Sequence, residues 1–125
     1  MIPEAEIYST IGAEGFERFV GSFYSRVATD DLIGPMYPPE DLVGAEERLR
    51  NFLIFRFGGP PLYIEQRGHP KLRARHMPYF INRAARDRWM ELMAASLSEA
   101  EIDPNAEATL LAFFESTTTF LINQT

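Results

Sequence analysis

The stretch EQRGHPKLRARHMPYF, residues 65–80, contains both histidines of the chain. Residues 71–77 are expected to form a short helix, which Pro78 ends because the residue before a proline avoids helical dihedral angles. His76 lies four residues after Leu72 on this helix. One ring N–H can therefore donate to the Leu72 carbonyl and leave the other nitrogen as a neutral metal ligand. The alternative is a capping or surface histidine, which is common near helix ends.

The second histidine, His69, precedes Pro70 in an expected loop. A turn residue bonded to the backbone is the favoured interpretation, and a two-histidine metal site is the alternative. The sequence holds no His-x-x-x-His or Glu-x-x-His pair, which argues against a mononuclear zinc or di-iron site.

The part of the chain around His76 is strongly basic. Residues 65–88 hold seven basic and two acidic residues, in a chain whose formal net charge is -6. The basic residues are Arg67, Lys71, Arg73, Arg75, Arg83, Arg86 and Arg88. A solvated basic face is one explanation. A bound dianionic cofactor beside His76 is the other, and haem has two propionates and an iron that takes an axial histidine.

Composition argues against several classes of protein. The acidic balance disfavours nucleic acid as a partner. The chain has no cysteine, which removes disulfides and thiolate chemistry and suits a reducing compartment. Residues 1–7 carry two acids and no base, unlike a signal peptide, and the most apolar segment, residues 52–57, is too short to span a bilayer. We therefore expect a soluble, cytoplasmic protein with neither a nucleic-acid nor a membrane partner.

Apolar residues recur at helical spacing through most of the chain. The spacing predicts four sizeable helices, over residues 13–28, 42–57, 83–97 and 105–123. Asn82 is expected to cap the third and Asp103, which precedes a proline, to cap the fourth. Residues 12–15 and 62–70 are expected to be loops, and no alternating strand pattern is found. The prediction is an all-α fold in a single domain over residues 1–125.

Aromatic residues make up 13% of the chain, with ten phenylalanines. This composition fits a phenylalanine-rich core and equally a core that also lines a large flat ligand. Tyr24 and Trp89 lie on the apolar stripes of their helices, and Tyr37 lies at a bend between prolines. For each of them the default expectation is core packing with a satisfied polar tip.

Together these residues resemble the group II truncated haemoglobins, the O-type bacterial globins. The resemblance spans roughly residues 8–95. It rests on four stretches. The first is FY at 23–24 with VATD at 27–30, and the second is GPMYP at 34–38. The third is GAEERL at 44–49 with FL at 52–53 and GGP at 58–60, and the fourth is EQRGHP at 65–70 with LR at 72–73, RH at 75–76 and PY at 78–79. The fourth is the most specific. The chain departs from the family pattern at Arg56-Phe57, where the family often has Tyr-Trp.

The resemblance implies a shortened globin in which two antiparallel helix pairs sandwich haem b. It also implies that His76 is the axial ligand of the iron. The distal residues that it implies are Tyr24, Tyr37 and Trp89, with Ala45 and Leu49 beside them. The cofactor-binding residues that it implies are Arg48 and Arg75 at the propionates or haem edge, and Phe52 and Phe80 in the haem wall.

The implied function is binding of dioxygen and other diatomic gases, such as carbon monoxide and nitric oxide. Release is expected to be slow, because phenol and indole groups donate hydrogen bonds to the ligand. The alternative is an enzyme for nitric oxide dioxygenation or peroxidase-like chemistry, served by a separate reductase. A third interpretation is a haem-free helical interaction domain with an aromatic core. A homodimer is also considered, since exposed apolar residues on the basic-segment helix or the last helix would support an interface.

Overall fold

The computed structural model describes residues 1–124, and this part of the chain is helical without strands. Its α-helices are α1 (Ile7–Val27), α2 (Leu42–Arg56), α3 (Leu62–Arg67), α4 (Leu72–His76), α5 (Arg83–Glu99) and α6 (Pro104–Phe120). Short 3-10 turns lie at Glu4–Glu6, Gly34–Met36 and Pro39–Asp41. The all-α prediction is therefore confirmed.

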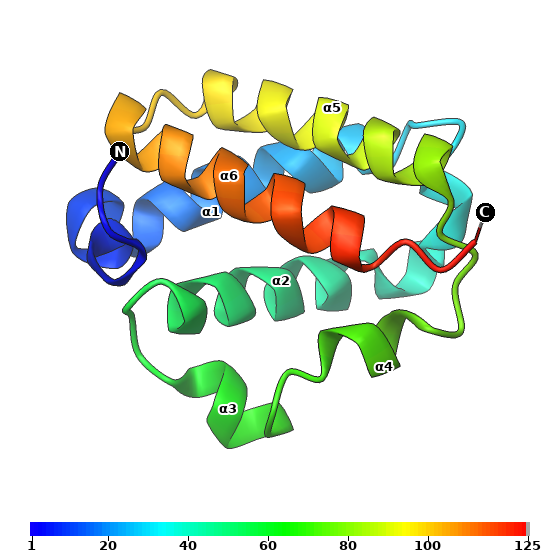
Figure 1. Ribbon diagram of the computed structural model, residues 1–125, viewed down its shortest axis with the longest axis horizontal. Helices are drawn as coiled ribbons and strands as arrows, with labels where there is room; N and C mark the ends of the chain where they lie inside the picture. Colours follow the sequence, from blue (N-terminus) through cyan, green and yellow to red (C-terminus); the bar gives the residue numbers. More distant parts are fainter. Residues whose placement is uncertain (125) are drawn as a thin grey trace.

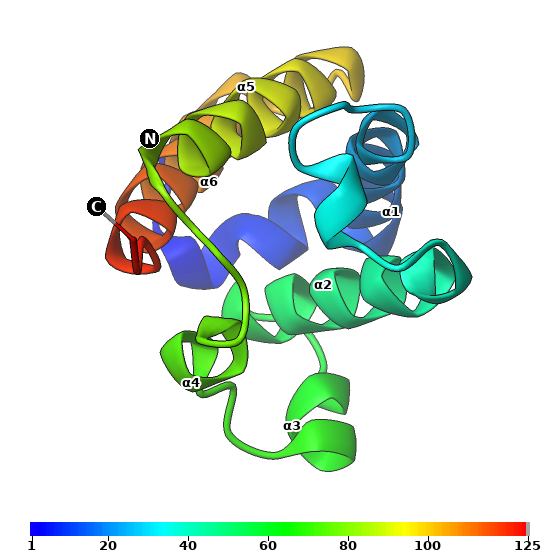
Figure 2. The ribbon, with the colours of Figure 1, turned by 90° about the vertical axis from the view of Figure 1, so that its right-hand side faces the viewer.

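The four long helices form two antiparallel pairs. Figure 1 shows α1 running against α2 and α5 running against α6, with α5 packed across α1. The short helices α3 and α4 lie on the side of α2 that faces away from α5 and α6, as Figure 1 and the quarter turn in Figure 2 show. Helix α4 ends at His76, which lines a cavity between the helices.

The apolar stripe predicted for the first helix forms the centre of the core. Phe16, Phe19 and Phe23 of α1 are fully buried, as are Val20 and Val27. Helix α1 begins earlier than expected, at Ile7, and bends at Gly12, where φ is 68° and ψ is 174°. The prediction of a loop over residues 12–15 is therefore wrong, because glycine admits this conformation and the helix resumes directly after it.

The predicted caps of the last two long helices are confirmed. The Asn82 side chain accepts a hydrogen bond from the N–H of Ala85. The Asp103 carboxylate accepts from the N–H groups of Asn105 and Ala106. These bonds satisfy donors that lack partners in the first helical turn and thereby set where α5 and α6 begin.

Two further segments differ from the sequence prediction. The sequence predicts a loop over residues 62–70, but α3 occupies residues 62–67. A six-residue helix is too short to display a period in the sequence. Its buried residue is Tyr63. Helix α6 ends at Phe120 rather than near Asn123, because the following residues turn to pair with the backbone of Ile81.

None of the helices within residues 1–124 is both long enough and apolar enough to cross a bilayer.

Two glycines with left-handed φ provide a test of this backbone. Alanine at Gly12, where a side chain would meet open space, should lower the free energy of unfolding by about 1–3 kcal/mol through strain alone. Alanine at Gly58, where φ is 96°, should lower it further, because the new Cβ would collide with the carbonyl of Ala5. Urea unfolding measures both variants. Equal losses would contradict the close approach of residue 5 to Gly58.

Candidate functional site

A cavity of about 560 Å³ lies between the long helices and α4. This volume is within the range of roughly 300–1,000 Å³ typical of small-molecule and cofactor sites. Its walls are mostly aromatic and aliphatic, with several arginines. Nine of the ten predicted site residues line it, namely Tyr24, Tyr37, Ala45, Arg48, Leu49, Phe52, Arg75, His76 and Trp89.

His76 occupies the last position of α4, and its ring is fixed by one backbone contact. Its Nδ1 lies 2.6 Å from the carbonyl oxygen of Leu72, as the spacing in the sequence predicts. A carbonyl only accepts, so Nδ1 carries a proton, and in the neutral ring the lone pair is then on Nε2. Nε2 has no hydrogen-bond partner within residues 1–124, and His76 lines the cavity. This tautomer is the one that a metal ligand requires.

The loop before α4 is held by Arg75 and by the other histidine. The Arg75 guanidinium donates to the carbonyl oxygens of Pro70 at 2.8 Å and Arg67 at 3.1 Å. Nδ1 of His69 accepts from the N–H of Lys71 at 3.1 Å, which is the backbone-bonded turn role that the sequence favours. Arg75 therefore lines the cavity and braces the segment that leads into α4.

A row of aromatic rings lines another wall of the cavity. Trp89 of α5 packs between Phe114 and Phe23, at centroid separations of 5.3 and 4.9 Å. Phe23 contacts Tyr24 at 5.1 Å, and Tyr24 meets Tyr37 edge to face at 5.7 Å. The structure thus brings together the three polar aromatic residues that sequence spacing alone does not connect. Their phenol and indole groups are the hydrogen-bond donors of this wall.

Burial keeps both phenols protonated. Burial is the main cause that raises the pKa of Tyr24 far above its ordinary value of 10.0, and the nearby Tyr37 adds to the increase. Burial likewise raises the pKa of Tyr37 to about 12, although hydrogen bonding with Trp89 and Tyr24 opposes the increase. Both side chains are therefore O–H donors throughout the neutral range.

The connection that carries Tyr37 is fastened to α5 by Asp30. The Asp30 carboxylate accepts from the N–H groups of Leu32 at 3.0 Å and Ile33 at 2.8 Å, and from Arg88 at 2.8 Å. Burial alone would raise the pKa of Asp30, but these hydrogen bonds hold it below its usual value. Since Arg88 directly precedes Trp89, this contact fixes the position of the Tyr37 segment relative to the indole.

The Arg48 guanidinium is already paired with a carboxylate, which makes it less available to bind an anionic ligand. Its two Nη atoms lie 2.6 and 3.4 Å from the two carboxylate oxygens of Asp41. The hydrogen bond from Arg48 is the main cause that lowers the pKa of Asp41. Arg48 lines the cavity but already has a bidentate acidic partner.

Phe80 is the predicted site residue that does not reach the cavity. Its side chain is 62% exposed, and the wall at this point is formed by Ile81. The turn after Pro78 directs the chain so that the residue after Phe80 points inward. The expectation that Phe80 is part of the cavity wall is therefore not met.

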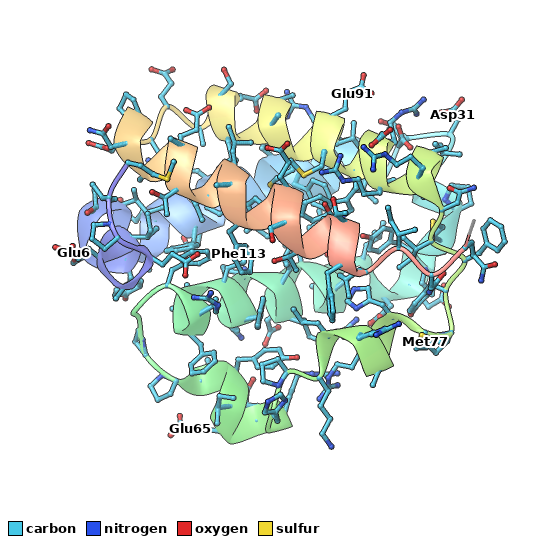
Figure 3. The ribbon with its side chains drawn as sticks, in the orientation of Figure 1. Glu6, Asp31, Glu65, Met77, Glu91 and Phe113 are labelled. Atoms are coloured by element: carbon cyan, nitrogen blue, oxygen red, sulfur yellow. The ribbon has the colours of Figure 1, made fainter. Side chains whose placement is uncertain are left out.

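Several cavity residues were missed by sequence reasoning. Tyr63, from the unexpected helix α3, is one, and the others include Ile81, Arg86, Phe113, Thr117 and Leu121. The Arg86 side chain is only 11% exposed and donates to the Thr118 hydroxyl at 3.2 Å and the Glu115 carbonyl at 3.1 Å. Figure 3 shows Phe113 between α6 and α2. The apolar stripe of α6 is a usable signal for that wall, and Arg86 belongs to the basic cluster of residues 65–88, whereas Tyr63 has no such signal.

Among the described residues, no group of three or more His, Asp or Glu side chains is arranged to hold a metal ion.

Comparison with known proteins points to one family. A family model described as bacterial-like globin matches residues 6–123. The chain is 36% identical over 118 residues to group 2 truncated hemoglobin YjbI of Bacillus subtilis, which covers 94% of this chain and 89% of the relative. The expectation of this family from the sequence is confirmed.

Solved structures support the same conclusion. The hemoglobin of Chloroflexus aurantiacus superimposes with a TM-score of 0.91 at 39% identity, covering 94% of this chain and 98% of that one. The structure described as truncated oxygen-avid haemoglobin from Bacillus subtilis gives a TM-score of 0.89 at 35% identity, with the same two coverages. The predicted truncated globin fold is therefore also confirmed.

The buried phenols predict a loss of stability at alkaline pH. Their folded pKa values lie above 10.0, near which tyrosines of the unfolded chain ionise, so the folded state binds more protons above that pH. The stabilisation is complete below about pH 10 and falls as pH rises from there towards 12. A Tyr24→Phe/Tyr37→Phe double variant should lose less stability than the wild type between about pH 9 and 11.

Urea unfolding at several pH values measures this difference. Tyr8→Phe, at a ring outside the cavity, is the control and should keep the wild-type dependence. An unchanged pH dependence in the double variant would contradict the role of these phenols.

Proposed function

The chain belongs to the bacterial-like globin family, among its group II truncated haemoglobins, and on this basis we propose that it holds haem through His76 and binds dioxygen. The observation that carries the proposal is the imidazole at the end of α4. Its Nδ1 is committed to the Leu72 carbonyl, and its ring lines the cavity. A neutral histidine held in this way is the protein ligand that globins supply to iron.

The residues around the cavity fit haem b. The aromatic and aliphatic walls suit the faces of a porphyrin, with Phe52, Leu49 and Ala45 of α2 among them. Arg75 and Arg67 line the cavity near α4 and offer positive charge to the propionates. Arg48 is the weaker candidate for that role, because Asp41 already engages its guanidinium.

When bound, haem supplies an iron that binds diatomic gases in its reduced state. Tyr24, Tyr37 and Trp89 supply the hydrogen-bond donors on the wall formed by α1, α5 and the connection before α2. The indole only donates, and the raised pKa of each tyrosine keeps its proton available. These three side chains stabilise partial negative charge on a diatomic ligand and thereby retain it.

Slow ligand release follows from these donors. A hydrogen bond to a charged partner contributes about 1.5–3 kcal/mol, and each 1.4 kcal/mol is a factor of about ten in an equilibrium constant. One such bond is enough to slow dissociation by roughly tenfold or more. A protein of this kind retains oxygen rather than delivering it in bulk, and the description of the Bacillus subtilis structure as oxygen-avid is consistent with that behaviour.

The iron ligand is tested by spectra of the haem-loaded protein. The wild type should show a stoichiometric Soret band that shifts when carbon monoxide is added to the reduced form. His76→Ala should lose the histidine-ligated spectrum, whereas His69→Ala should keep it, because His69 is exposed and lies outside this cavity. Wild-type protein without stoichiometric haem would overturn the proposal.

The distal donors are tested by the rate of oxygen release in stopped flow. Trp89→Phe removes the indole N–H and should raise the dissociation rate about ten- to hundredfold. Tyr8→Phe, outside the cavity, is the matched control and should leave the rate unchanged. A fast wild-type rate that Trp89→Phe does not alter would contradict distal retention.

A second candidate function is turnover of nitric oxide or peroxide. The gathering of three donors on one wall favours it as well, because the same groups stabilise charge that develops on a reacting oxygen. Sustained turnover requires electrons from a separate reductase. Nitric oxide consumption over many turnovers with a reductase, and its failure without one, would distinguish an enzyme from a binding protein. The absence of cysteine supports a cytoplasmic location for either role.

A further inference from the structure

The segment after α6 returns to the chain between α4 and α5. Figure 1 shows this tail meeting the connection that leads out of α4. The backbone N–H groups of Asn123 and Gln124 both donate to the carbonyl oxygen of Ile81, at 2.9 and 3.0 Å. Residues more than 40 positions apart in sequence are thus joined directly beside the end of the helix that carries His76.

The Asn123 side chain uses both ends of its amide in this contact. Its Oδ1 accepts from the N–H of Ile81 at 3.0 Å. Its Nδ2 donates to the carbonyl oxygens of Tyr79 at 2.9 Å and His76 at 3.3 Å. We call this set of contacts, made by the Asn123 amide and the backbone of residues 123–124, the tail clasp.

One of the groups that Asn123 binds, the His76 carbonyl, lies at the end of α4, and the other two belong to the connection after it. The last carbonyls of any helix have no N–H partner within that helix. Pro78 cannot supply one here, because proline has no backbone N–H. Within residues 1–124, the His76 carbonyl otherwise accepts only from the N–H of Tyr79, at 3.0 Å. A helix of five residues is also far below the length at which helices are stable by themselves. Its geometry therefore depends on contacts from outside.

We propose that Asn123 is a positioning residue that sets the orientation of the His76 imidazole. The ring is anchored one turn earlier, at Leu72, and the backbone of His76 is anchored by the tail clasp. Because the ring is held at Leu72 and the backbone of His76 is held by Asn123, the imidazole keeps one orientation towards the cavity. This inference rests on the proposed role of His76 as iron ligand.

The clasp also closes the cavity wall on this side. Ile81 and Leu121 both line the cavity, and they flank the contacts made by Asn123. Loss of the clasp would free Ile81 together with the end of α4. A weakened clasp should therefore affect the retention of haem as well as the geometry of its bond to His76.

The experiment compares Asn123→Ala, Asn123→Asp and Gln124→Ala in the full-length, haem-loaded protein. Resonance Raman of the reduced, ligand-free form reports the iron–histidine stretching band, and transfer of haem to an acceptor globin in excess reports its release. Asn123→Ala should shift and broaden the band and speed haem release about tenfold, which corresponds to about 1.4 kcal/mol. Gln124→Ala keeps the backbone N–H and should match the wild type.

Asn123→Asp separates the two halves of the amide. Aspartate retains an acceptor for the Ile81 N–H but cannot donate to the two carbonyls, and it places negative charge against them. It should therefore change the band at least as much as alanine does. An aspartate variant with the wild-type band would overturn the role assigned to the donors.

The remaining outcomes are decisive as well. A lower melting temperature in Asn123→Ala with an unchanged stretching band would overturn positioning and leave a structural contact alone. Wild-type protein without an iron–histidine band would instead overturn the proposed function, and the positioning role with it. An unchanged band and unchanged haem release in Asn123→Ala, beside a normal wild type, would overturn the positioning role of Asn123 and leave the proposed function intact.

Discussion

The packing of phenylalanine rings between α1, α2 and α6 supports the rest of the molecule. Phe16, Phe19, Phe57, Phe113 and Phe114 form a continuous set of contacts, with ring centroids 4.9 to 6.5 Å apart. A small domain depends on such burial, since its surface is large relative to its interior. This packed cluster of rings supports the helices, so that they can also surround a cavity of about 560 Å³. Phe113 and Phe114 also form part of the cavity wall, so the packed cluster lies directly against the cavity.

The helix that carries His76 depends on its surroundings. Helix α4 has five residues and begins after Lys71, whose φ of 45° lies in the left-handed region. Arg75 braces the segment that enters it, and Asn123 binds the segment that leaves it. Tertiary contacts at both ends therefore determine where the imidazole points, and intrinsic helix propensity contributes little. On the tyrosine and tryptophan wall, by contrast, Tyr24 and Trp89 are carried by the long helices α1 and α5.

Local signals in the sequence were sufficient for much of the fold and for the centre of the site. The four-residue spacing of Leu72 and His76, and the caps at Asn82 and Asp103, act within one helical turn and appear in the structure as predicted. The helix α3, the exposure of Phe80 and the tail contacts of Asn123 were not predictable in this way. The tail contacts of Asn123 depend on partners distant in the sequence. Helix α3 and the turn at Phe80 are too short to give a periodic pattern. Family resemblance connected Tyr24, Tyr37 and Trp89, which spacing could not.

Trp89 is the only tryptophan of the chain, and its indole lies on the cavity wall. The intrinsic tryptophan fluorescence of the protein therefore originates at a single point beside the site. A porphyrin absorbs light at the wavelengths that indole emits, so a porphyrin held in this cavity would quench that emission by energy transfer. Emission from this one side chain consequently provides an optical gauge of cavity occupancy, which needs no label and no change to the protein.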